Sequence, residues 1–235
     1  MDGPRILAHR GACRVAQENT LAAFSAAAAL GADGVELDVH RSADGVLVVH
    51  HDADAPGIGV LAEHSAAAIR RTLPYVPTLE EALDACAGLL VNIEVKNLPG
   101  DADFDHDDRA AKELVELLHA RDRRDDVLIS SFNLATIDRV RTRDPKLPTG
   151  FLTLLGFDPL AGAAVANDHG HAAVHPDVRS LPGPAAAAVA TQAHDLGLTV
   201  NVWTVDDPNE IRRLAAAGVD GIVTNVPDVA RDTLR

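Results

Sequence analysis

The feature that most constrains the fold is an alternation, along the whole chain, of short apolar runs with Ala- and Leu-rich stretches of helical composition. Strands that alternate with helices in this way indicate repeated βα units and a parallel sheet. Strand-like segments occur at residues 6–11, 35–40, 46–51, 89–96, 127–132, 150–154, 172–175, 199–205 and 221–225. Helices are expected at 19–30, 78–86, 106–121, 134–143, 184–196, 208–217 and 227–234.

Nine strands are one more than an eight-stranded barrel holds, and a turn signal accounts for the ninth. Asp44-Gly45 is a two-residue hairpin signal between the second and third segments. With that turn, Ala43 faces Val46, and Asp38 stands opposite His51. One hairpin fills one barrel position, which leaves eight βα units. The sequence therefore predicts a TIM (βα)8 barrel with a hairpin extension on its second strand and a short insertion after it.

The size of the chain suits this fold. At 235 residues and 47% hydrophobic composition, one α/β barrel or two small domains can form. No linker rich in Pro, Gly or Ser divides the sequence. We therefore expect a single barrel domain over residues 1–235.

Charge and composition limit the partners and the compartment. The formal net charge is −14 without a long basic run, so nucleic acid and anionic membrane surfaces are poor partners. Cys13 and Cys86 show neither metal nor disulfide spacing and are expected as free thiols. Without a secretory signal pattern or an 18-residue apolar segment, we expect a cytoplasmic protein that does not insert stably into membranes. The oligomeric state is not predicted.

Three acidic residues are expected to meet at the carboxyl ends of the barrel strands, where active sites of this fold lie. In Val35-Glu36-Leu37-Asp38-Val39 the two-residue alternation turns both carboxylates to one face, and the strand at 89–96 places Glu94 and Lys96 likewise. Buried like charges at this density repel one another unless a cation or a shared proton relieves them. Oxygen ligands without a thiolate favour Mg²⁺ or Ca²⁺ over zinc.

Basic residues are expected around the acidic cluster. His9 and Arg10 end the first strand, and His51 and Lys96 end two others. Two histidines suit general acid and base catalysis near neutral pH, and Arg and Lys suit a phosphate group. Together with a metal ion, these residues predict cleavage of a phosphoester.

The sequence resembles the glycerophosphodiester phosphodiesterases. The segments that carry the resemblance are HRGACRVAQENTLAAF from His9, GADGVELDVHRSADGVLVVHHD from Gly31, VPTLEEAL from Val76, NIEVK from Asn92, SSFN from Ser130, VNVWTV from Val200 and GVDGIVTNVPD from Gly218. They occur in family order from one end of the chain to the other.

The resemblance implies hydrolysis of glycerophosphodiesters to glycerol phosphate and an alcohol. It implies His9 and His51 as the acid–base pair, in unassigned order, and Glu36, Asp38 and Glu94 as metal ligands. Arg10 and Lys96 would contact the phosphate. In the family mechanism one histidine deprotonates the glycerol 2-hydroxyl, which attacks phosphorus to form a cyclic phosphate. The other histidine protonates the leaving alcohol, and water then opens the ring.

Two departures from the family pattern stand near these motifs. Gln17 replaces the usual Pro before Glu18-Asn19-Thr20, where Asn19 or Thr20 can still cap the helix. The segment after His51, residues 53–75, is shorter than usual. This leaves the wall around the alcohol as the least defined part of the expected site.

Several residues have structural alternatives. The three carboxylates could form an ion-pair network with Arg10 and Lys96. Trp203 could pack at the barrel mouth or form an apolar wall for the glycerol, and Phe132 has the same ambiguity. His169 and His171 precede their strand and are expected as solvated loop histidines at the bottom of the barrel. Ser130 and Ser131 lack a nucleophile elbow, which leaves serine hydrolysis unsupported.

Three other functions remain open. The same centre could cleave acylated glycerophosphodiesters as a lysophospholipase D. A non-catalytic barrel that binds a phosphate ligand is opposed by the presence of both His9 and His51. A lyase that uses the carboxylates for enolate chemistry fits the paired histidines less well than phosphoryl transfer does.

Overall fold

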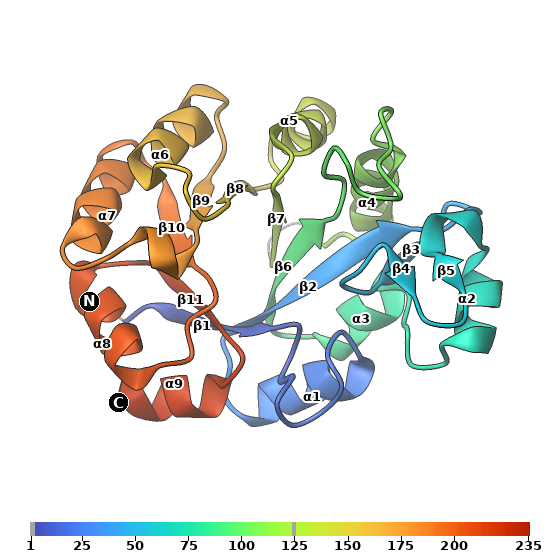
Figure 1. Ribbon diagram of the computed structural model, residues 1–235, viewed down its shortest axis with the longest axis horizontal. Helices are drawn as coiled ribbons and strands as arrows, with labels where there is room; N and C mark the ends of the chain where they lie inside the picture. The colour runs from blue at the N-terminus through green and yellow to red at the C-terminus, as the bar shows by residue number, and fades with distance from the viewer. Residues whose placement is uncertain (1–2, 124–125) are drawn as a thin grey trace.

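The computed structural model describes residues 3–123 and 126–235, and in these residues eight parallel strands close into a barrel (Figure 1). The neighbour order is β1-β11-β10-β9-β8-β7-β6-β2, and β1 pairs with β2 to complete the ring. The barrel strands are β1 (Arg5–His9), β2 (Gly34–Arg41), β6 (Leu90–Val95), β7 (Val127–Ser131), β8 (Thr149–Thr153), β9 (Ala173–Pro176), β10 (Thr199–Val202) and β11 (Gly221–Thr224). The predicted TIM barrel is confirmed.

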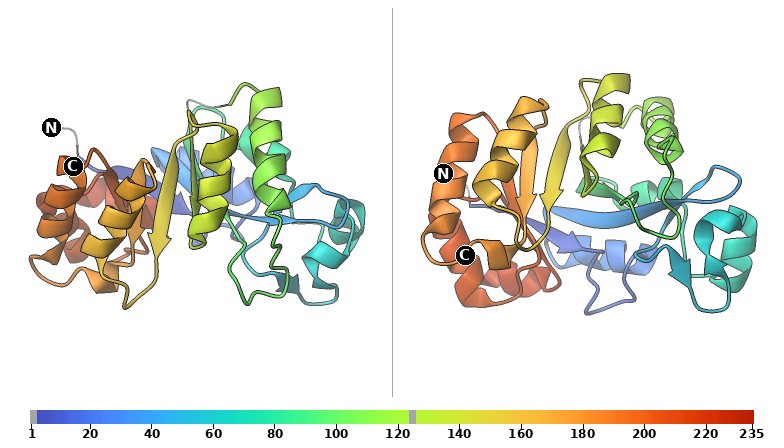
Figure 2. Two further views of the ribbon diagram at one scale, coloured as in Figure 1. Left: turned by 90° about the horizontal axis from the view of Figure 1, so that it is seen from above. Right: turned by 45° about the horizontal axis from the view of Figure 1, so that its top comes forward.

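Helices follow the strands and surround the barrel (Figures 1 and 2). They are α1 (Leu21–Ala29), α2 (Ala66–Thr72), α3 (Leu79–Ala85), α4 (Arg109–Ala120), α5 (Leu134–Arg143), α6 (Pro159–Asp168), α7 (Ala185–Asp195), α8 (Pro208–Ala217) and α9 (Pro227–Thr233), with 3₁₀ turns η1 (Leu61–Glu63) and η2 (Val178–Ser180). All seven predicted helices are present, within three residues at each end.

Two helices are absent from the sequence prediction, α2 and α6. The α6 segment contains Gly162, which weakens a helical pattern. In the structure α6 packs so closely on β8 that a Cβ at Gly162 would lie 2.9 Å from Thr153 Cγ2. The start signal is nevertheless in the sequence, because Asp158 caps Leu160 N–H directly before Pro159.

The predicted hairpin exists, but its register is wrong by one residue. In β3 (Leu47–Val49), Val49 pairs with Val39, so His50 rather than His51 stands opposite Asp38. The loop has three residues, 43–45, because Ser42 N–H donates to Val46 O and Gly45 takes a left-handed φ of 84°. A type I turn followed by a left-handed glycine gives this geometry, whereas a two-residue loop does not.

The alternation in β2 explains how a buried strand carries acidic residues. Val35, Leu37 and Val39 are fully buried in the apolar layer between the strands and α1, α3 and α4. Glu36 and Asp38 face the opposite way, into the barrel, and are also buried. Burying each of the apolar side chains stabilises the fold by roughly 1.5–3 kcal/mol, so a slip of one residue, which would exchange the two faces, is strongly disfavoured.

Polar side chains also fill part of the barrel interior beside the acidic residues. His175 covers Gly150, where a Cβ would lie 2.5 Å from Nε2, and Asn201 covers Gly221. The Asn201 Nδ2 group donates to His175 Nε2 at 3.0 Å. The two glycines therefore make room for a buried polar layer that supports the carboxyl end of the barrel.

The insertion after β3 forms a small unit at one side of the barrel (Figure 1). It contains the hairpin of β4 (Asp54–Ala55) and β5 (Gly59–Val60), then η1 and α2, around a separate apolar cluster of Val48, Ala55, Leu61, Ile69, Leu73 and Val76. Across the described ranges, no helix is both long and apolar enough to cross a membrane.

Candidate active site

Three buried carboxylates meet at the carboxyl ends of β2 and β6. Glu36 and Asp38 extend from β2, and Glu94 extends from β6 directly beside Asp38 in the parallel register. One oxygen of each carboxylate lies within 4.8 Å of the others. Asp38 is 1% exposed and Glu36 is 4% exposed, so the group is shielded from bulk water.

Lys96 and Arg10 neutralise part of this negative charge. Lys96 Nζ lies 2.8 Å from Asp38 Oδ1 and also contacts Glu94, while Arg10 Nε lies 3.4 Å from Asp38 Oδ2. Burial alone would raise the pKa of Asp38, but Lys96 and Arg10 outweigh it and lower that pKa to about 2. Burial likewise opposes the charge on Lys96, and Asp38 and Glu94 raise the pKa of Lys96 above its usual value.

Glu36 is the carboxylate that these cations do not reach. It accepts the backbone N–H of Arg10 at 3.0 Å, but within the described ranges no Lys or Arg side chain pairs with it and its buried Oε1 has no hydrogen-bond partner. Burial, with Asp38 and Glu94 close by, raises the pKa of Glu36 well above its usual value. Burial also raises the pKa of Glu94, against the influence of Lys96.

The orphaned oxygen is the observation that distinguishes a cation site from an ion-pair network. Three carboxylates face two cationic side chains, and an unpaired buried carboxylate oxygen is costly. Asn92 Oδ1, which stands beside Glu36 in the register, is also buried without a partner in the described chain. This all-oxygen set fits a hard divalent cation.

His9 is oriented by an amide. Its Nδ1 lies 2.7 Å from Asn225 Oδ1, and Asn225 Nδ2 donates to Asp206 Oδ2 at 2.7 Å. Because a carboxylate only accepts, Asp206 fixes which way the amide points, so His9 Nδ1 carries the proton. The other nitrogen, Nε2, therefore faces the carboxylates, 3.9 Å from Glu36. Burial lowers the pKa of His9, although the bond to Asn225 partly offsets it.

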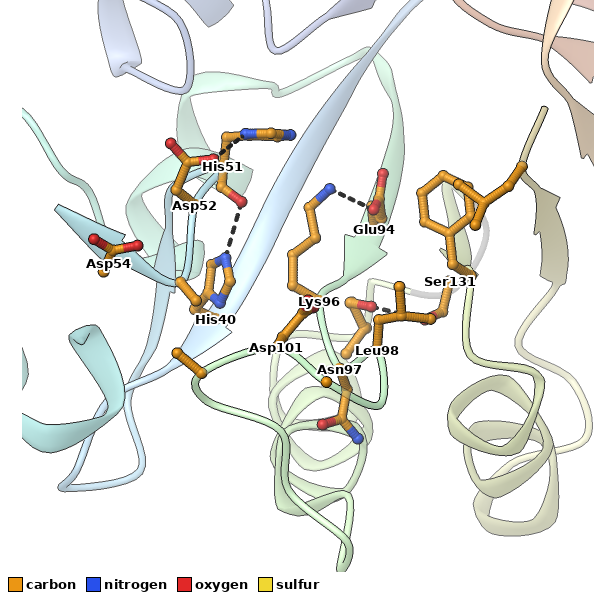
Figure 3. Close-up of a pocket in the computed structure, with 16 residues that line it drawn as sticks. His40, His51, Asp52, Asp54, Glu94, Lys96, Asn97, Leu98, Asp101 and Ser131 are labelled. Atoms are coloured by element: carbon orange, nitrogen blue, oxygen red, sulfur yellow. Dashed lines mark hydrogen bonds and ion pairs between the residues drawn. The ribbon is translucent and has the colours of Figure 1, made fainter.

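His51 is oriented by a carboxylate in the same way. Its Nδ1 lies 2.6 Å from Asp52 Oδ1, which leaves Nε2 free to act. Its carbonyl oxygen is 3.1 Å from Nε2 of the buried His40 (Figure 3). The Nδ1 of His40 is 2.6 Å from Asp103 Oδ2. Burial lowers the pKa of His51, whereas Asp38 raises it.

Two cavities adjoin the carboxylates. A pocket of about 470 Å³ is lined by residues that include His51, Glu94, Lys96 and Phe132 (Figure 3). A cavity of about 20 Å³ on the His9 side is lined by His9, Glu36, Asn92, Glu94, Leu152, His175, Trp203 and Val223. Glu94 borders both spaces, so the acidic cluster lies between the two histidines.

Phe132 and Trp203 form an aromatic wall between these spaces. Their ring centroids are 5.4 Å apart in an edge-to-face arrangement, and the Trp203 indole donates to the His175 carbonyl at 2.8 Å. Both rings are half-buried. The wall can therefore contact a small apolar surface, such as a glycerol backbone, while the indole N–H remains satisfied.

A family model described as the glycerophosphoryl diester phosphodiesterase family matches residues 9–229. The chain belongs to this family. It is 29% identical to a glycerophosphodiester phosphodiesterase of Caldanaerobacter subterraneus, over 98% of this chain and 97% of that protein. The predicted resemblance, and the prediction that the chain is an enzyme of this family, are confirmed.

Solved structures of glycerophosphodiester phosphodiesterases share the barrel. One from Thermotoga maritima is 25% identical, covers 100% of both chains and has a TM-score of 0.84. An Oleispira antarctica phosphodiesterase, solved with the product sn-glycerol-3-phosphate, is 24% identical, covers 99% of this chain and 97% of that chain, and has a TM-score of 0.85. At that identity the second likeness shows the fold alone.

The structure brings together every site residue that the sequence predicts for this glycerophosphodiester phosphodiesterase family member. The set is His9, Arg10, Glu36, Asp38, His51, Glu94, Lys96, Phe132 and Trp203. His51 reaches the site although the predicted register, which placed it opposite Asp38, is wrong, because it lies beyond the ladder, where the chain turns into the pocket. The roles of these residues stay predictions.

Four supporting residues were missed by sequence reasoning: Asn19, His40, Asp52 and Asn225. Asn19, expected only as a possible cap, donates to Asp38 Oδ2 at 2.7 Å, while Thr20 caps α1. His40 is the next inward position after Asp38, so the β2 alternation could have identified it. Asn225 and Asp52 depend on loop geometry that the sequence alone does not specify.

Proposed function

We propose that this protein hydrolyses glycerophosphodiesters to sn-glycerol 3-phosphate and an alcohol, with a divalent metal ion and with His9 and His51 as the acid–base pair. The observation that carries the proposal is the pair of imidazoles on either side of three buried carboxylates. Each imidazole has its Nδ1 engaged, by Asn225 or by Asp52. Family membership and the curated glycerophosphodiester phosphodiesterase relative support the substrate class.

Glu36, Asp38 and Glu94 would hold the metal ion, which we propose is Mg²⁺ or Ca²⁺ because the donor set contains only oxygen. When bound, the ion would neutralise phosphate oxygens and lower the pKa of a hydroxyl group. It would also satisfy the orphaned Glu36 Oε1.

Lys96 and Arg10 would bind the phosphate. Both cations already lie beside Asp38 and are held there by ion pairs, so a phosphate that enters meets preorganised donors. The aromatic wall of Phe132 and Trp203 would contact the glycerol carbons.

The proton transfers follow from the paired histidines. One imidazole takes the proton of the glycerol 2-hydroxyl, whose oxygen attacks phosphorus while the bond to the alcohol breaks. The other imidazole, protonated, gives its proton to the leaving alcohol oxygen. Water then opens the cyclic phosphate with the two roles exchanged, which restores both histidines.

The test is a panel of metal ions and substrates coupled to detection of sn-glycerol 3-phosphate. Metal-stripped protein receives Mg²⁺, Ca²⁺, Mn²⁺ or no ion, with the glycerophosphodiesters of choline, ethanolamine, glycerol and inositol. We expect release of glycerol phosphate from at least one diester, and only with a metal ion. Release of glycerol together with the phosphorylated alcohol, or no turnover of any diester, would contradict the proposal.

An apolar surface at the pocket favours a second candidate, cleavage of acylated glycerophosphodiesters. Leu154 is 52% exposed and lines the 470 Å³ pocket, and Leu155 and Phe157 follow it in the β8–α6 loop with large exposed areas. An acyl chain could lie on this surface. Lysophosphatidylcholine should then release choline and lysophosphatidic acid, and Leu154→Ser should reduce that turnover more than the turnover of glycerophosphocholine.

A further inference from the structure

A second group of potential metal ligands lies at the opposite end of the barrel. Asp138 extends from α5, His169 directly follows α6, and His171 precedes β9, so these side chains lie near the amino-terminal ends of the strands. The carboxylate cluster lies at the carboxyl ends. The expectation of two solvated loop histidines is right for His169, which is exposed, and wrong for His171, which is buried.

His171 is held as a metal ligand would be. Its side chain is 0% exposed, and Nδ1 lies 2.9 Å from the Thr149 hydroxyl. Its Nε2 is buried, has no hydrogen-bond partner in residues 3–123 and 126–235, and faces Asp138 Oδ1 at 3.4 Å. A ligating imidazole ordinarily has its second nitrogen fixed by a polar neighbour, as Thr149 fixes Nδ1 here.

The two ring nitrogens of His171 face different neighbours, Thr149 at Nδ1 and Asp138 at Nε2. When the Thr149 hydroxyl accepts the proton of His171 Nδ1, the Nε2 lone pair faces a carboxylate oxygen of Asp138. Two lone pairs that face each other across 3.4 Å are satisfied by a cation between them.

Asp138 and His169 complete a three-donor set. The Asp138 oxygens lie 3.0 and 2.9 Å from His169 Nδ1, and one donor atom from each of the three residues falls within 4.8 Å of the others. The two imidazole rings are nearly parallel, with centroids 6.0 Å apart. His169 and Asp138 are open to solvent, so they can close on an ion and leave a position for water.

We propose that Asp138, His169 and His171 form a second metal site, for Zn²⁺ or a similar borderline divalent ion, that ties α5 to the segment between α6 and β9. Two imidazoles and one carboxylate suit Zn²⁺, whereas the oxygen-only cluster at the other end suits Mg²⁺ or Ca²⁺. The site is structural, because it lies far from the strand ends that carry the proposed chemistry.

One nearby charge opposes this site. Arg141 lies over the same loop, where a Cβ on Gly170 would be 2.7 Å from its guanidinium. Its positive charge reduces the attraction for a cation. Arg141→Ala should therefore tighten binding of a cation at this site.

The test measures Zn²⁺ binding by calorimetry to the full-length, metal-stripped Glu36→Gln/Glu94→Gln protein, in which the first cluster is disabled. We expect one equivalent bound at micromolar or lower concentration, with a higher melting temperature. His169→Gln and Asp138→Asn should each weaken binding by about tenfold or more. His194→Gln, which changes another exposed histidine paired with an aspartate, should leave binding unchanged.

Spectroscopy distinguishes a metal ion held by defined ligands from an ion that associates loosely with surface residues. When Co²⁺ replaces Zn²⁺, we expect the visible absorption bands that Co²⁺ shows at a low coordination number. These bands should disappear in His169→Gln. The proposal would be overturned if the Glu36→Gln/Glu94→Gln protein bound no stoichiometric Zn²⁺. It would also be overturned if adding His169→Gln or Asp138→Asn to that protein left its Zn²⁺ affinity unchanged. Because the readouts are binding and melting, they are independent of whether the diesterase activity is found.

Discussion

The amide oxygen of Asn225 lies 2.7 Å from Nδ1 of His9, and Asp206 fixes the orientation of that amide. Asn225 therefore positions His9. In Asn225→Ala we expect kcat to fall by about 10–100-fold with a smaller change in KM. The bond to Asn225 raises the pKa of His9, so its loss should move the limb of the pH–rate profile that reports His9 to lower pH.

Cys13 supplies the control for that prediction. Its thiol donates to the same Asn225 oxygen at 3.1 Å. Cys13→Ser keeps a donor there and should leave both kcat and the profile nearly unchanged. A pH profile of Asn225→Ala that coincides with the parent profile would mean that Asn225 does not act through His9.

Glu36 and Asp38 should differ in what they contribute to stability. Glu36 is buried with an unpaired oxygen, and a glutamine resembles its protonated form, so Glu36→Gln should unfold at the same or a higher temperature in EDTA. Asp38→Asn removes the charge that Lys96 and Arg10 share, leaving Lys96 with Glu94 and Arg10 with Glu18, and should lose about 3–5 kcal/mol of unfolding free energy.

Metal affinity should not follow that stability order. Both variants should lose at least about tenfold in Mg²⁺ or Ca²⁺ affinity, because each lacks a proposed ligand. Chemical denaturation in EDTA and calorimetric metal titration measure the two properties separately. Equal destabilisation by Glu36→Gln and Asp38→Asn would show that Glu36 is already satisfied in the metal-free protein.

The roles of His9 and His51 can be assigned by the leaving group. With glycerophosphocholine, His9→Ala and His51→Ala should each lose about 10²–10⁴-fold in kcat. A nitrophenolate leaves without a proton, so with a glycerol nitrophenyl phosphate the variant that lacks the general acid should recover most of its activity. The variant that lacks the base should not. Recovery of activity in both variants would contradict acid–base catalysis by His9 and His51.

His175 should make the protein sensitive to acid. Burial lowers its pKa to about 3, against about 6.5 for an unfolded histidine. Between these values the unfolded chain binds a proton that the folded chain does not, so the unfolding free energy falls as the pH falls. This contribution approaches about 1.4 kcal/mol per pH unit. His175→Gln keeps an acceptor for Asn201 and should show a shallower fall between pH 6 and pH 4, whereas parallel curves would contradict this origin.

The sequence predicts the barrel because βα periodicity depends on local patterning that recurs along the whole chain. What it does not predict are features set by particular backbone angles. The left-handed Gly45 lengthens the hairpin loop and moves His50, not His51, opposite Asp38. Gly162 weakens the helical pattern of α6, although close packing on β8 requires a small residue there.

The candidate site likewise contains residues whose placement follows from a local sequence pattern and residues whose placement does not. Glu36, Asp38, Glu94 and Lys96 lie on strands, where a period of two decides which way each side chain points. Asn225, by contrast, follows its strand, and its contact with His9 joins residues 216 positions apart. No local pattern encodes that contact, so it emerges only from the closed barrel.

The most direct test of the central claim follows the phosphorus atom of glycerophosphocholine by ³¹P NMR, with metal-stripped protein before and after Mg²⁺ or Ca²⁺ is added back. The account predicts conversion to sn-glycerol 3-phosphate only after metal addition, by the parent protein and not by His9→Ala or His51→Ala. Undiminished conversion in EDTA, or in both histidine variants, would contradict it.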